Sequence, residues 1–154
     1  MKRILSLLLA FSTCHAKSIV TEEFVNKVGI IESNLKPDAV GDDGESLGAF
    51  QIGRRAWADA VAYSSLIAGP HDYCLPTDWK GHAHDFEMSQ RAATLILKMH
   101  EERMVRNRIK PTEFKLYMAY NMGYHGAAQH GFDINQTWGF RKAILTRAKV
   151  ILSR

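Results

Sequence analysis

The sequence predicts one mainly α-helical domain with a short loop or β-hairpin after its first helix. Three observations support this fold class. The 154 residues suit a single compact domain and leave little room for a second. Apolar side chains recur at three- and four-residue spacing in several segments, which is typical of amphipathic helices. Turn-forming Gly and Asp residues are concentrated between Gly41 and Gly48, too densely for a helix.

The first helix is expected at about residues 21 to 35. Thr21 suits its start, acidic residues follow in the first turn, and Pro37 is expected to end it. Residues 68–84 contain two Pro and two Gly and are expected to be irregular. The later helices are expected at residues 53–66, 85–104, 111–123 and 137–152. Asp85 is expected to cap the second of these, which is expected to bury Ala92, Leu95, Ile96 and Met99. The last of these helices is expected to place four apolar residues on one face: Phe140, Ile144, Ala148 and Ile151.

Residues 1–16 have the pattern of a secretory signal peptide. Lys2 and Arg3 precede an apolar run, and small residues lead to Ala16. The apolar run is too short to span a membrane, so stable membrane insertion is not expected. We therefore expect a mature chain that begins at Lys17 and is exported to the periplasm or secreted. A lipoprotein signal acylated at Cys14 is the alternative, although the residues before Cys14 do not match the usual pattern.

The charge balance disfavours nucleic acid as a partner. The formal net charge is +4, and it falls to +2 when Lys2 and Arg3 leave with the signal peptide. The remaining basic residues are scattered rather than clustered in the stripe that a nucleic-acid-binding protein requires. Mild positive charge suits a polymer of diffuse negative charge, such as a bacterial wall. Cys74 is the only cysteine left after cleavage, so no internal disulfide is expected.

No metal or cofactor site is predicted. Phosphate-loop, dinucleotide-binding and Gly-x-Ser-x-Gly signatures do not occur. Several potential metal ligands lie close together in the chain, but their spacing does not match that of a zinc site. These residues are His71, Asp72, Cys74, His82, His84 and Asp85.

Glu32 is the strongest candidate for chemistry. It lies on the apolar stripe of the first helix, four residues after Val28, so it should point toward the core or into a cleft. A carboxylate there must be neutralised by a partner or kept for catalysis, because burial disfavours its charged form. Glycoside cleavage needs such an acid, held protonated near neutral pH, and often a second carboxylate across the cleft. Asp42 and Asp43 follow in the next turn.

Three short motifs resemble those of the lysozyme-like soluble lytic transglycosylases. That family has three motifs in a fixed order: a Glu-Ser pair, a Gly-Leu-Met-Gln stretch and an Ala-Tyr-Asn-Ala-Gly stretch. The resemblance covers nearly all of residues 17–154 and implies a lysozyme-like catalytic domain. The corresponding segments here are Glu32-Ser33, Gly48-Ala49-Phe50-Gln51-Ile52 and Ala119-Tyr120-Asn121-Met122-Gly123.

The resemblance implies a peptidoglycan-cleaving enzyme that acts on the β-1,4 bond between N-acetylmuramic acid and N-acetylglucosamine and leaves 1,6-anhydro ends. It implies that Glu32 is the general acid and base, and that glycan strands are the partner, with an envelope-spanning machinery as a further possibility. It also implies roles for five binding residues. Ser33 would orient Glu32 or contact a stem peptide, Gly48 would admit the glycan close to the backbone, Gln51 and Asn121 would bind sugar groups, and Tyr120 would contact the Glu32 carboxyl.

Three alternatives remain open. The tract from Gly41 to Ala60 also resembles invertebrate-type lysozymes and their bacterial relatives, which hydrolyse the same bond with a second carboxylate, here Asp42. Their dense disulfides are absent. A non-catalytic wall-binding module would keep the groove without the chemistry. In a helical interaction protein, Glu32 would instead form an ion pair with Arg141 or Lys142.

Overall fold

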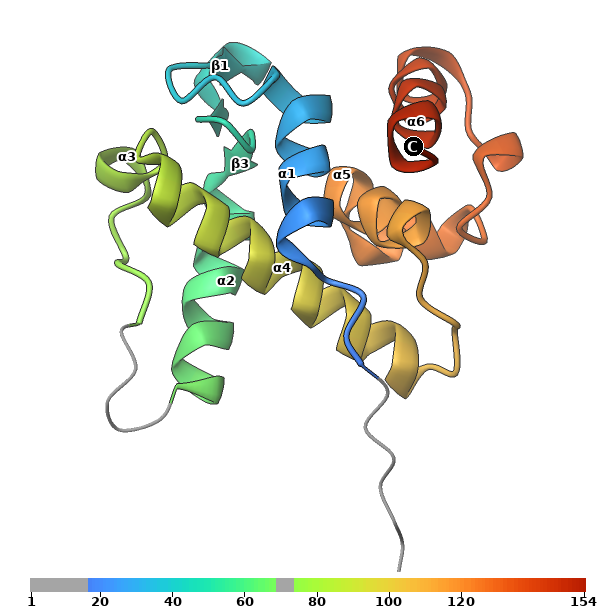
Figure 1. The fold of residues 1–154 in the computed structure, drawn as a ribbon, viewed down its shortest axis with the longest axis horizontal. Helices are drawn as coiled ribbons and strands as arrows, with labels where there is room; N and C mark the ends of the chain where they lie inside the picture. Colours follow the sequence, from blue (N-terminus) through green and yellow to red (C-terminus); the bar gives the residue numbers. More distant parts are fainter. Residues whose placement is uncertain (1–16, 69–73) are drawn as a thin grey trace, which may run out of the picture.

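The computed structural model describes residues 17–68 and 74–154, in which helices dominate and a small sheet follows the first helix (Figure 1). The mainly α-helical prediction is therefore confirmed. The predicted signal peptide, residues 1–16, lies outside the described residues. The helices are α1 (Glu22–Ser33), α2 (Arg54–Ile67), α3 (Trp79–His82), α4 (Phe86–Arg106), α5 (Glu113–Gln129) and α6 (Gly139–Leu152).

The sheet is a hairpin extended by a third strand. β1 (Val40–Gly41) pairs with β2 (Ser46–Leu47), and β2 pairs with β3 (Ile52–Gly53), both antiparallel. A single 3₁₀ turn, Asp42–Gly44, connects β1 to β2. The glycine-rich segment after the first helix thus forms the predicted hairpin.

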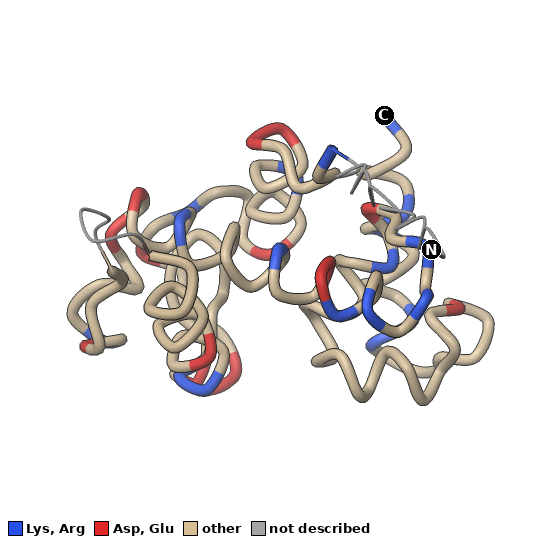
Figure 2. Tube along the Cα trace, turned by 90° about the horizontal axis from the view of Figure 1, so that it is seen from below, with Lys and Arg blue, Asp and Glu red and all other residues tan. Residues whose placement is uncertain are grey.

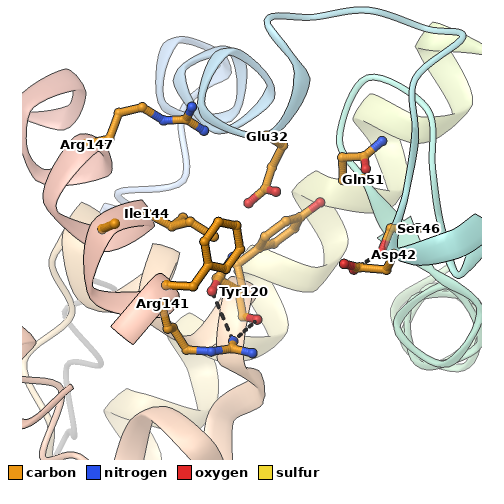
Figure 3. Close-up of a pocket in the computed structure, with 11 residues that line it drawn as sticks. Glu32, Asp42, Ser46, Gln51, Tyr120, Arg141, Ile144 and Arg147 are labelled. Atoms are coloured by element: carbon orange, nitrogen blue, oxygen red, sulfur yellow. Dashed lines mark hydrogen bonds between the residues drawn. The ribbon is translucent and has the colours of Figure 1, made fainter. Parts of the chain in front are cut away.

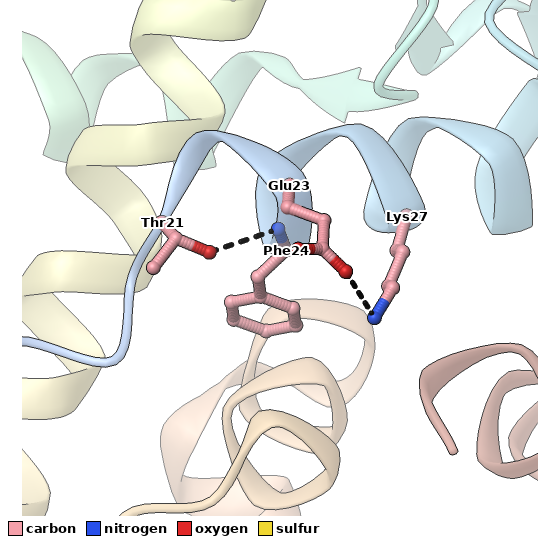
Figure 4. A network of polar contacts seen from close by, with 4 residues as sticks. All are labelled: Thr21, Glu23, Phe24 and Lys27. Atoms are coloured by element: carbon pink, nitrogen blue, oxygen red, sulfur yellow. Dashed lines mark hydrogen bonds and ion pairs between the residues drawn. The ribbon is translucent and has the colours of Figure 1, made fainter. Parts of the chain in front are cut away.

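Helix α1 begins as its sequence predicts but ends earlier. The Thr21 side chain accepts a hydrogen bond from the Phe24 backbone N–H at 3.2 Å, and Glu23 pairs with Lys27 at 2.9 Å (Figure 4). The helix ends at Ser33, not at Leu35 before Pro37. Asn34 and Leu35 have φ of 59° and 60°, and the Leu35 N–H bonds back to the Gly29 carbonyl, so the left-handed turn ends the helix before the proline does.

Helix α4 is the central element, and α1, α2 and α5 all pack against it (Figure 1). Asp85 caps it as predicted, because its carboxylate accepts the Met88 N–H at 2.9 Å. Of the four residues expected on its buried face, Ala92, Leu95 and Ile96 are buried and Met99 is partly buried. Burial of this face and of the apolar stripe on α1 contributes favourably to folding.

One expectation about the C-terminal half was wrong. Helix α5 does not stop near Gly123 but continues to Gln129, with a kink where Gly123 adopts φ 72° and ψ 152°. It resumes because Tyr124 and Ala127 bury apolar surface beyond the kink. Helix α6 forms as predicted; of the four apolar residues expected on one face, Ala148 is buried and Phe140, in the first turn, is 83% exposed. The irregular segment before α4 also contains the short helix α3.

Charged positions of both signs are interspersed along the chain in the view of Figure 2. Within the described part of the chain, no helix combines the length and hydrophobicity needed to cross a membrane.

Candidate active site

A cleft of about 810 Å³ lies between the hairpin and helix α6, with α1 and α5 contributing to its wall (Figure 3). Its volume is in the range of small-molecule binding sites. The lining residues are Glu32 from α1; Asp42, Ser46 and Gln51 from the hairpin region; Tyr120 and Asn121 from α5; and Phe140, Arg141, Ala143, Ile144 and Arg147 from α6. Glu32, Gln51, Tyr120 and Asn121, which come from the three sequence motifs, therefore meet in one place.

Glu32 points into this cleft from the last turn of α1 (Figure 3). The hydroxyl of Tyr117 donates a hydrogen bond to its Oε1 atom at 2.9 Å. Tyr117 is fully buried in α5 and does not line the cleft, so it binds one carboxylate oxygen from within the core. The side chain of Glu32 is only partly buried and remains reachable from the cleft.

Burial raises the pKa of Glu32 from 4.5 to about 7. The Tyr117 hydroxyl, the Asn121 side chain and the charge of Arg147 each lower this pKa, while the charge of Asp42 raises it. Loss of water is thus the dominant cause, as in glycosidases whose acid occupies an apolar setting. Glu32 can carry a proton near neutral pH and release it in a reaction.

Replacing Tyr117 with Phe tests this balance. The Tyr117 hydrogen bond favours the ionised carboxylate, so its removal should raise the pKa of Glu32 by about one unit. A ¹³C NMR titration of the Glu32 carboxyl measures the shift directly. Tyr63→Phe is the control, because the Tyr63 hydroxyl bonds to Glu102 and not to Glu32. An unchanged or lower Glu32 pKa in Tyr117→Phe would show that the hydrogen bond does not act as described.

The ion pair that an interaction protein would require is not formed. Arg141 donates to the carbonyl and side-chain oxygens of Asn121, at 2.9 and 3.1 Å, and not to Glu32. Lys142 is exposed and makes no ion pair with Glu32 in the described structure. The Arg147 guanidinium donates to the Ile31 carbonyl and affects the pKa of Glu32 only through its charge.

Asp42 faces Glu32 from the hairpin side of the cleft (Figure 3). Its carboxylate accepts a hydrogen bond from the Ser46 hydroxyl at 2.9 Å, and its backbone has φ 48°. Asp43 has φ 54° and does not line the cleft. Both aspartates therefore serve the turn, since Asp tolerates the left-handed region better than most residues, and Asp42 alone also presents a carboxylate to the cleft.

Gln51 and Asn121 both line the cleft, as predicted for sugar-binding residues. The Gln51 amide donates to the Gly48 carbonyl at 2.9 Å, and its backbone has φ 48°. Its Oε1 atom lies against Gly41, 2.1 Å from the position that a Cβ there would occupy. Gln51 reaches the cleft from the hairpin region and Asn121 from α5.

Three other predicted residues have contacts that differ from those expected. Tyr120 lines the cleft, but its hydroxyl donates to the Phe50 carbonyl at 2.7 Å, and Tyr117 contacts Glu32 in its place. The Ser33 hydroxyl donates to the Ala49 carbonyl at 2.7 Å and ties the end of α1 to the hairpin, outside the cleft lining. Gly48 is buried with φ 76°, and a Cβ there would lie 1.8 Å from the Ala83 carbonyl oxygen. The chain's own backbone, not a glycan, requires this glycine.

The histidine-rich segment before α4 does not form a metal site in the described residues. No group of three or more His, Cys, Asp or Glu within residues 17–68 and 74–154 is arranged to hold a metal ion. His84 contacts the Pro37 carbonyl through Nδ1 at 2.8 Å, and Asp85 caps α4. His71 and Asp72 lie outside the described residues.

Sequence reasoning missed the α6 wall and Tyr117. Tyr117 precedes Tyr120 by three residues, so helical spacing could have placed both on the Glu32 side of α5. Phe140 was noted only as part of the apolar face of the last helix, and Arg147 carried no signal, because an exposed cleft residue on a helix looks like any other surface position.

No family model, no curated protein and no solved structure matches this chain. The site is therefore interpreted from its own geometry.

Proposed function

We propose that the protein is an exported lytic transglycosylase that cleaves the β-1,4 bond between N-acetylmuramic acid and N-acetylglucosamine in peptidoglycan. The observation that carries this proposal is Glu32, a carboxyl with a pKa of about 7 on the wall of an open cleft. A group with this pKa is suited to act first as acid and then as base at neutral pH.

The reaction needs one carboxyl and no water. Glu32 donates its proton to the glycosidic oxygen as the bond from that oxygen to C1 of the muramic acid breaks. The C6 hydroxyl of the same sugar then attacks C1, its proton passes to the Glu32 carboxylate, and a 1,6-anhydro ring closes. The substrate's N-acetyl group stabilises the cationic intermediate, so a second protein carboxylate is not required.

The other cleft residues suit a glycan. Gln51 and Asn121 line the same cleft as Glu32, and amide side chains can hydrogen-bond sugar hydroxyl and N-acetyl groups. Phe140 is largely exposed on the α6 wall, where its ring offers a flat apolar face to a sugar. Incubation with purified peptidoglycan should release soluble fragments. Binding without release would instead favour a wall-binding module.

A lysozyme-type hydrolase is the second candidate, and the position of Asp42 in the same cleft favours it. A hydrolase needs a second carboxylate to attack the sugar or to activate water. Asp42 is exposed, and its side chain is held by Ser46. It has the chemistry for either role.

Asp42→Asn and Asp43→Asn separate these candidates. Because the transglycosylase route uses no second carboxylate, each variant should keep most of the wild-type rate of fragment release from peptidoglycan. Asn also tolerates the left-handed backbone at both positions, so folding should be preserved. Asp43→Asn is the matched control, since Asp43 shares the turn but not the cleft. Loss of activity by about 100-fold or more in Asp42→Asn alone would support the hydrolase.

A further inference from the structure

The side-chain amide of Asn121 in α5 accepts a hydrogen bond from Arg141 of α6. One nitrogen of Arg141, Nη1, donates to both the backbone carbonyl and the side-chain Oδ1 of Asn121, at 2.9 and 3.1 Å (Figure 3). Arg141 lies in the first turn of α6, and Asn121 lies in α5. The contact therefore links the two helices at the cleft.

The backbone contact lies beside a break in α5. Gly123, two residues after Asn121, leaves the helical region, and this disturbs the regular ladder of hydrogen bonds there. The backbone carbonyl of Asn121, just before this break, accepts a hydrogen bond from the Arg141 guanidinium. Arg141 thus fixes the backbone from which the Asn121 side chain projects.

The side-chain contact fixes which way the amide faces. A guanidinium only donates hydrogen bonds, so the atom of the amide that faces Arg141 must be the oxygen. The Asn121 NH₂ group is then turned away from Arg141.

We propose that Arg141 is a positioning residue that holds the Asn121 amide with its NH₂ donors directed at the Glu32 carboxyl and the substrate. This deepens the proposed function, and it rests on that function only where the substrate is concerned. The Asn121 side chain already lowers the pKa of Glu32, which agrees with a donor that faces the carboxylate. The other groups that act on Glu32 are Tyr117 of α5, Arg147 of α6 and Asp42 of the hairpin.

The test is the pKa of Glu32 in the full chain, followed by ¹³C NMR of its carboxyl, in a double-mutant cycle of Arg141→Met and Asn121→Ala. Each single variant should raise the Glu32 pKa by about 0.5 to 1 unit, because each removes the donor from the carboxylate. The double variant should show no larger shift than Asn121→Ala alone. Lys142→Met is the charge control, since it removes the same charge from the adjacent, exposed position.

A shift from Arg141→Met that persists undiminished in the Asn121→Ala background, or that Lys142→Met reproduces, would overturn the proposal, because Arg141 would then act by charge alone. Arg141→Lys keeps the charge without the planar guanidinium and should recover only part of the wild-type pKa. Full recovery would also count against positioning. The titration needs no activity, so a chain that shows the coupling but does not cleave peptidoglycan would refute the proposed function and leave the role of Arg141 standing.

Discussion

Replacing Glu32 with Gln should reduce the rate of fragment release from peptidoglycan by about 100-fold to 10,000-fold, the usual contribution of a general acid. Gln keeps the shape of Glu and can still accept the Tyr117 hydrogen bond, but it cannot donate a proton to the glycosidic oxygen. A variant that keeps more than a tenth of the wild-type rate would remove Glu32 from the mechanism.

The same substitution should stabilise the fold at neutral and higher pH. The pKa of Glu32 is raised in the folded state, from 4.5 to about 7, so the folded protein binds more protons than the unfolded chain between these values. Ionisation therefore favours unfolding as the pH rises through this window. Glu32→Gln should leave stability nearly unchanged at pH 4 and increase it by about 2 kcal/mol at pH 8.

Urea unfolding of both proteins at the two pH values measures this difference. Glu22→Gln is the control, because Glu22 is exposed at the opposite end of the same helix. A Glu32→Gln variant that is less stable than wild type at pH 8 would indicate that the carboxylate is a structural partner, as in the interaction-protein alternative.

The second large effect is expected from Gly48→Ala, which should destabilise the fold by about 3 kcal/mol or more. Gly48 has φ 76°, and an added Cβ would lie 1.8 Å from the Ala83 carbonyl oxygen. The clashing atom belongs to the backbone, so it cannot rotate away. To relieve the clash, the hairpin must move away from Ala83 and the segment before α4. This movement would displace the hairpin wall of the cleft.

Gly44→Ala provides the matched control. Gly44 lies in the same hairpin with φ 94°, but nothing lies within 4 Å of the position its Cβ would occupy. Only the backbone strain remains, which costs about 1 to 2 kcal/mol. Thermal or urea unfolding of the two variants separates the cost of backbone strain from the cost of the clash with Ala83. Equal destabilisation would show that the contact with Ala83 has no effect of its own.

Local signals carried most of the fold prediction. The helix caps at Thr21 and Asp85 depend only on neighbouring residues, and so does the hairpin predicted from the turn residues after α1. The positions of all three were predicted correctly. Helix ends were less predictable, because the left-handed Asn34 and Leu35 end α1 before Pro37, and buried contacts carry α5 past Gly123. These outcomes depend on tertiary packing that no local pattern reveals.

A site residue was predictable from the sequence where a charged side chain occupied a position that the helical pattern reserves for apolar residues. Glu32 stood out because a carboxylate occupied an apolar stripe, and its cleft position agrees with that argument. The individual partners were not predictable. Tyr117, and not Tyr120, bonds Glu32 because a difference of three residues along α5 decides which hydroxyl reaches the carboxylate. Arg141 entered as a possible ion-pair partner of Glu32 and instead binds Asn121, which only the packing of α6 against α5 determines.

Mass spectrometry of the fragments released from purified peptidoglycan tests the central claim most directly. A transglycosylase retains the substrate's own C6 oxygen in the new ring, so each muramic acid end is lighter by one water than the reducing end that a hydrolase leaves. We expect anhydro ends as the main product of the wild-type protein and their loss in Glu32→Gln. Reducing ends as the main product, or no released fragments at all, would contradict the account.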